Sequence, residues 1–156
     1  MHILITGGSK RKRKLVRECI KFASEKILTP IVDNKITIFV QFKKLPEYWC
    51  ASTLPIYYNG ISTNRPKEFI IEIEERCPLN VIKSFIFHEM VHVKQHVKGH
   101  LRDYLRSEHV NWKGKKMAFK IDKFQSYFLS EWEVEAFGIA HGLIELHENK
   151  NKVDMK

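Results

Sequence analysis

The chain has 156 residues, of which 44% are hydrophobic and 29% charged, and its formal net charge at pH 7 is +9. This length suits a single domain with a proper core, and ten Phe and five Tyr exclude a low-complexity, disordered chain. Three cysteines that form no CxxC pair indicate neither a disulfide framework nor a zinc ribbon. No run approaches the ~20 apolar residues of a membrane span, and the N-terminus lacks the pattern of an export signal, so a cytoplasmic protein is expected.

The first part of the chain predicts a strand followed by a helix. Residues 2–6 form a short apolar run typical of a strand. Ser9 is a suitable N-cap for a helix over about residues 10–28, and Pro30 would stop it. Seven basic residues and one acid lie within 10–21, which is enough positive charge to attract DNA or another polyanion.

Strands are expected in the middle of the chain. Apolar and polar residues alternate over 36–42 and 68–74, which is the period of a half-buried strand. Asn59–Gly60 between apolar runs is typical of a hairpin turn. Because Glu72 and Glu74 would protect an exposed strand from aggregation, we expect 68–74 at the edge of a twisted antiparallel sheet.

A second helix is predicted from about residue 79 to 98, where Gly99 is a natural terminator. The segment that follows is mixed, with a turn expected at Lys113–Gly114. Residues 94–120 hold eight basic residues and two acids, a second region that could bind DNA or another polyanion.

The last predicted helix spans about residues 131–148. A polar segment at 149–156 is expected to be a flexible tail. The order of helix, strands, helix, irregular segment and helix indicates one α+β domain over residues 1–148.

His88-Glu89-Met90-Val91-His92 forms an HExxH pattern inside the second predicted helix. His88 and His92 lie one turn apart on the same helix face, so both imidazoles can bind one zinc ion. Glu89 follows the first of them, so its carboxylate is expected beside the metal, where it can take a proton from a water that zinc activates. Apolar neighbours indicate that this helix is buried on at least one side. The sequence therefore predicts a zinc site with Glu89 as the general base.

A catalytic zinc ion usually has three protein ligands, and the HExxH pattern supplies two of them. His96 lies about 12 Å along the helix axis from His88, too far to share one ion, and is expected to be partly exposed. The main candidates are the acids at the start of the last helix, Glu131, Glu133 and Glu135. Positions i and i+2 point in different directions, so Glu133 and Glu135 cannot both face the zinc.

These motifs resemble the gluzincin peptidases, and in particular small bacteriophage-encoded metallopeptidases. The resemblance covers residues 80–140 and is carried by HEMVHVKQ (88–95), WKG (112–114) and WEVEA (132–136). It implies a minimal zincin-like fold, with the sheet packed against the HExxH helix and the C-terminal helix delivering a glutamate. In gluzincins with an ExxA segment the first glutamate binds the metal, which implies Glu133 here, with Glu135 as the alternative.

HEMVH also resembles the SprT-like proteases, which cleave proteins crosslinked to DNA and use three histidine ligands. That resemblance implies His109 as the third ligand, although Val110–Asn111 replaces the Gly-Pro that follows the histidine in their pattern. Tyr127 and Tyr104 are candidates for contacting the oxyanion or the substrate.

The sequence thus predicts a zinc metalloendopeptidase, a hydrolase with one zinc ion that acts on a protein or peptide in the cytoplasm, or in the host cytoplasm if the gene belongs to a phage. The alternative is a catalytically inactive, zinc-stabilised module that binds nucleic acid or serves as a scaffold. The positive charge favours this module. The intact Glu89 does not, because a purely structural site needs no general base.

Overall fold

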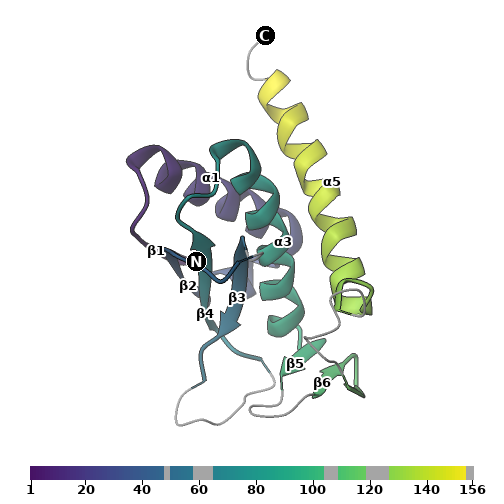
Figure 1. Ribbon diagram of the computed structural model, residues 1–156. Helices are drawn as coiled ribbons and strands as arrows, with labels where there is room; N and C mark the ends of the chain where they lie inside the picture. Colours follow the sequence, from purple (N-terminus) through teal and green to yellow (C-terminus); the bar gives the residue numbers. More distant parts are fainter. Residues whose placement is uncertain (48–49, 58–64, 104–108, 119–126, 154–156) are drawn as a thin grey trace.

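A computed structural model describes residues 1–47, 50–57, 65–103, 109–118 and 127–153. Within these ranges the chain forms two β-sheets and four helices, a mixed α+β fold as expected. The smaller sheet lies at one end of the molecule, beside the start of the last helix (Figure 1). None of the helices in these ranges has the length and apolar content needed to cross a membrane.

The larger sheet has the strand order β1-β2-β4-β3. Its strands are β1 (His2–Thr6), β2 (Thr37–Lys43), β4 (Glu68–Glu74) and β3 (Ala51–Pro55). β1, β2 and β4 are parallel to one another, and β3 is antiparallel to β4, so the prediction of an antiparallel sheet was wrong. The helix between β1 and β2 explains the parallel pairing, because such a crossover returns the chain in the same direction.

β4 lies inside this sheet, between β2 and β3, so the prediction that residues 68–74 form an edge was also wrong. The glutamates expected to protect an edge instead form ion pairs. Glu72 pairs with Lys43 at 2.8 Å, and Glu74 pairs with Arg76 at 2.8 Å. Of the described strands, it is β3 that borders the candidate site as an edge of this sheet.

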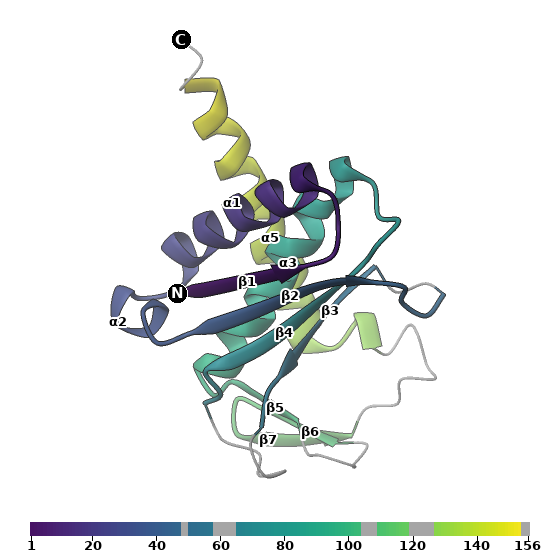
Figure 2. The same ribbon diagram turned by 90° about the vertical axis from the view of Figure 1, so that its left-hand side faces the viewer.

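Two helices, α1 (Lys10–Ile27) and α3 (Leu79–Val97), lie beside the larger sheet (Figure 2). Ser9 caps α1 by accepting a hydrogen bond from the Lys12 backbone N–H at 3.2 Å. The main core lies between these helices and the sheet. It includes Val16, Ile20, Ile38, Val40, Phe69, Ile71, Ile82, Ile86 and Met90.

The remaining helices are the short α2 (Pro30–Asp33) and the long α5 (Glu131–Val153). α5 packs against α3 and adds Ala140 and Leu143 to the main core. It continues past its predicted end near residue 148, so the first part of the segment expected to be a flexible tail is helical.

The smaller sheet is antiparallel and consists of β5 (Leu101–Asp103), β6 (His109–Trp112) and β7 (Lys115–Ala118). The predicted turn at Lys113–Gly114 joins β6 to β7, and both residues have positive φ. Leu101, Val110, Trp112 and Trp132 form a second hydrophobic cluster. This cluster fixes the start of α5 against the smaller sheet. The expected turn at Asn59–Gly60 lies outside the described residues.

Candidate metal centre

α3 presents His88 and His92 on the face that meets α5. The opposite side of α3 is anchored in the main core by residues such as Ile82 and Ile86, which are fully buried. This anchoring directs the two imidazoles toward α5, one helical turn apart. Their Nε2 atoms lie 3.0 Å from each other.

α5 supplies the third group of the centre. Oε2 of Glu133 lies 3.1 Å from His88 Nε2, and Oε1 lies 3.3 Å from His92 Nε2. The Glu133 side chain is almost completely buried. His88, His92 and Glu133 form a group whose ligand atoms all lie within 4.8 Å of one another, close enough to hold a metal ion.

The other two acids at the start of α5 have different partners. Glu131 accepts a hydrogen bond from Trp112 Nε1 at 2.8 Å. Glu135 accepts one from Gln95 Nε2 at 2.9 Å and forms an ion pair with Lys113 at 3.2 Å. Each of the three alternating acids therefore has its own environment, and Glu133 is the one beside the histidines.

His109 and Tyr104, two other predicted candidates, are not part of this group. His109 lies on β6 and is half-buried. Among the described residues, the group of converging ligand atoms does not include it. Tyr104 lies outside the described residues. Tyr127, by contrast, lies beside this group and donates a hydrogen bond to Glu133.

The buried charges of the centre stabilise one another. Burial raises the pKa of the Glu133 carboxyl, but hydrogen bonds with His88, His92 and Tyr127 outweigh it and hold this pKa well below its usual range. Burial lowers the pKa of His92, but the hydrogen bond with Glu133 and the charge of Glu89 outweigh it and raise this pKa to about 9. The surrounding carboxylates therefore favour the protonated form of His92.

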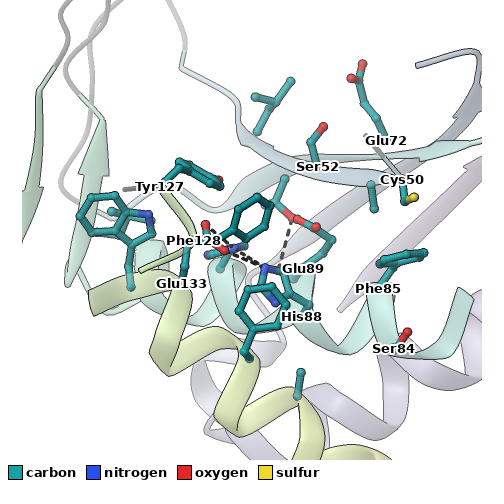
Figure 3. Close-up of a pocket in the computed structure, with 18 of the residues that line it drawn as sticks. Cys50, Ser52, Glu72, Ser84, Phe85, His88, Glu89, Tyr127, Phe128 and Glu133 are labelled. Carbon is teal, nitrogen blue, oxygen red and sulfur yellow. Dashed lines mark hydrogen bonds and ion pairs between the residues drawn. The ribbon is translucent and has the colours of Figure 1, made fainter. Parts of the chain in front are cut away.

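Glu89 lies on α3 beside the centre. The residue is 5% exposed and lines a cavity of about 720 Å³ between α3, α5 and β3. The Thr53 hydroxyl donates a hydrogen bond to the Glu89 backbone oxygen at 3.3 Å, which ties α3 to the edge strand. Figure 3 shows Glu89, His88 and Glu133 close together, with Phe85 and Phe128 also at the cavity.

The structure differs from the sequence analysis at two buried residues of α3. His96, expected to be partly exposed, is 2% exposed and packs near Phe69. Gln95, for which no role was predicted, is completely buried. It forms a hydrogen bond with His92, in which Gln95 Oε1 lies 2.9 Å from His92 Nδ1. The signal that could have found Gln95 is its spacing, because a polar residue three positions after a ligand lies on the same helix face.

The burial of His96 predicts that acid destabilises the protein. Burial, together with the charge of His92, lowers the pKa of His96 to about 3. In the unfolded chain the pKa of histidine is about 6.5. Between these values the unfolded chain binds a proton that the folded chain does not, so the free energy of unfolding decreases as pH falls, by at most about 1.4 kcal/mol per pH unit.

We expect His96→Gln to reduce this loss of stability between about pH 6.5 and pH 5. The measurement is urea unfolding in the presence of a chelator, so that release of a metal does not contribute. His2→Gln is the control, because His2 is exposed. The prediction would be contradicted if the free energy of unfolding changed equally with pH in His96→Gln and in the wild-type protein.

No protein-family model matches the chain, and neither a curated protein nor a solved structure matches it. Function is therefore inferred from the side chains of the centre and from the motifs that contribute them.

Proposed function

We propose that the protein is a zinc-dependent peptidase in which His88, His92 and Glu133 hold the metal and Glu89 is the general base. One observation carries this proposal. Two imidazole nitrogens and a carboxylate converge beside a second carboxylate, at the wall of a cavity large enough for part of a peptide. The resemblance of the motifs to gluzincins favours the same assignment and a zincin-like fold.

The spacing of the three side chains suits zinc. Bonds of about 2.0–2.1 Å in tetrahedral geometry separate the ligand atoms of a zinc ion by about 3.3 Å. Here 3.0 Å separates the two Nε2 atoms, while Glu133 Oε2 lies 3.1 Å from His88 Nε2 and its other oxygen, Oε1, lies 3.3 Å from His92 Nε2. Two histidines and one glutamate are also a donor set typical of catalytic zinc, which keeps a position open for water or substrate. A site of this kind favours hydrolysis over a purely structural role.

The residues around the site have separate roles in the proposed reaction. When bound, zinc lowers the pKa of water and polarises the substrate carbonyl. The Glu89 carboxylate accepts a proton from the attacking water and passes it to the nitrogen of the leaving amine. Its burial in the cavity wall limits competition from bulk water. The Tyr127 hydroxyl lies at the same wall and is the described candidate for a contact with the substrate oxygen.

The cavity and the edge strand favour an extended peptide with an apolar side chain. Aromatic residues from two elements line the cavity, including Phe85 from α3 and Phe137 from α5. β3 pairs with β4 on one side, and among the described strands it has no neighbour on the other. A peptide can bind such a strand through backbone hydrogen bonds while its alternate side chains enter the cavity.

This proposal predicts zinc-dependent cleavage of unfolded protein. We expect the purified protein to bind one zinc ion and to cleave a denatured protein substrate next to bulky apolar residues. Mass spectrometry identifies the cleavage sites, and elemental analysis gives the zinc content. Removal of zinc with a chelator abolishes cleavage, and adding zinc restores it.

The same experiment distinguishes the alternative of an inactive module. α1 favours nucleic-acid binding, because it begins with five consecutive basic residues and has no acid in its first turn. Positive charge at a helix N-terminus is unfavourable for the helix, so a polyanionic partner would relieve it. Zinc binding without cleavage, together with salt-sensitive retention on DNA, would contradict the peptidase and support that module.

A further inference from the structure

Gln95 connects the metal centre to the start of α5. It lies on α3, three residues after His92, and is completely buried. Its Oε1 is 2.9 Å from His92 Nδ1. Its Nε2 donates hydrogen bonds to the Trp132 backbone oxygen and to Glu135 Oε2, both at 2.9 Å. The amide therefore contacts a candidate ligand on one side and α5 on the other.

These partners determine the orientation of the Gln95 amide. The Trp132 carbonyl and the Glu135 carboxylate can only accept hydrogen bonds, so the NH2 group of Gln95 must face them. Oε1 then faces His92 Nδ1, and this oxygen can only accept. Nδ1 of His92 must carry a proton, which leaves Nε2 as the atom that can bind a metal. Nε2 is the atom that faces His88 and Glu133.

Glu135 is itself held by a residue of the smaller sheet. Lys113 Nζ lies 3.2 Å from Glu135 Oε1 and 4.5 Å from the centre of the Trp112 ring. Lys113 is at the β6–β7 turn, where its φ is 47°. A chain of contacts thus runs from this turn through Glu135 and Gln95 to His92.

We propose that Gln95, oriented by Glu135, is a positioning residue that holds His92 in the Nδ1-protonated form whose Nε2 binds the metal. Gln95 acts through His92, since its own amide atoms are bonded to other groups. The inference rests on the proposed function and adds to it the residue that prepares one ligand.

Zinc affinity measures this role directly. We expect Gln95→Leu to weaken zinc binding by about 10- to 100-fold, as is typical when the hydrogen-bond partner of a metal-bound histidine is lost. The affinity is measured by competition with a chromophoric chelator, which does not depend on catalysis. Gln41→Leu makes the same chemical change in β2 and keeps the wild-type affinity. A role in stability alone would lower the free energy of unfolding of the metal-free protein and leave zinc affinity unchanged.

A swapped pair tests the orientation argument. In Gln95→Glu/Glu135→Gln, the carboxylate at position 95 still accepts from His92 Nδ1, and the new amide at position 135 donates to that carboxylate, so the swap restores two of the three contacts and removes only the donor to the Trp132 carbonyl. We expect this double variant to bind zinc more tightly than Gln95→Leu. Gln95→Glu alone brings two carboxylates together and binds less tightly than the swapped pair. Equal affinity in all of these variants would overturn the proposal.

The wild-type protein provides a measurement that does not depend on the folding of any variant. Nitrogen-15 NMR of the zinc-loaded protein is expected to show His92 protonated at Nδ1 and bound to zinc through Nε2. Coordination through Nδ1 overturns the role of Gln95. If the wild-type protein binds no zinc, the proposed function fails as well, whereas tight binding that is unchanged in Gln95→Leu removes only the positioning role.

Discussion

Glu89→Gln is expected to abolish peptide cleavage while the protein keeps its zinc. Glutamine has nearly the same shape as glutamate but cannot accept the proton of the attacking water. Loss of a general base typically lowers the rate by about 10²- to 10⁴-fold. Glu89 is outside the group of converging ligand atoms, so zinc content should remain at the wild-type level. The measurements are the cleavage rate of a peptide found among the products and elemental analysis of the purified variant.

Glu131→Gln is the matched control for this experiment. It makes the same change in a nearby acid whose partner, Trp112 Nε1, can still donate to the new amide oxygen. We expect cleavage by this variant to match the wild-type rate. Loss of zinc from a folded Glu89→Gln protein, or cleavage at the wild-type rate, would contradict the role proposed for Glu89.

The second large effect is expected from Glu133→Gln, which removes the carboxylate proposed as the third ligand. The loss of zinc affinity should exceed the 10- to 100-fold typical of an outer hydrogen-bond partner. An amide oxygen is a weaker ligand than a carboxylate, and the buried charge that balances the metal disappears. Zinc affinity, measured by chelator competition, is the direct readout.

The alternatives for the third ligand are the natural comparisons. His109→Gln is expected to bind zinc like the wild-type protein. Glu135→Gln is expected to lose no more affinity than an outer partner would, because Glu135 contacts Gln95 and Lys113. The assignment of Glu133 would be wrong if its variant kept zinc and one of these two lost it.

Local patterns predicted the elements of the fold well, but the pairing of strands less well. The helix at 10–27 and the strands at 2–6 and 68–74 lie close to where periodicity predicts them. The parallel pairing of the strands was not predicted, although the helix between the first two strands already favours a parallel crossover. The position of β4 inside the sheet could not be seen from its own alternation, because strand order depends on long-range contacts.

In the candidate site, too, local spacing predicts one part, whereas the other depends on long-range packing. A helical spacing of four residues is sufficient to place His88 and His92 together. The choice among the acids of residues 131–135 depends on how α5 docks. That docking is set by Trp112 and Lys113, which belong to a sheet in a segment that appeared irregular in sequence. Only the resemblance to gluzincins implied Glu133 in advance.

The candidate metal centre joins elements that belong to the two hydrophobic clusters. α3 belongs to the main core, whereas the beginning of α5 is held by the cluster that contains Trp112 and Trp132. An ion bound by His88, His92 and Glu133 would link α3 to the start of α5, and thus connect these separately packed regions. The free energy of metal binding would then stabilise the packing of the smaller sheet and the start of α5 against α3, so this region would become more rigid as more of the sites are occupied.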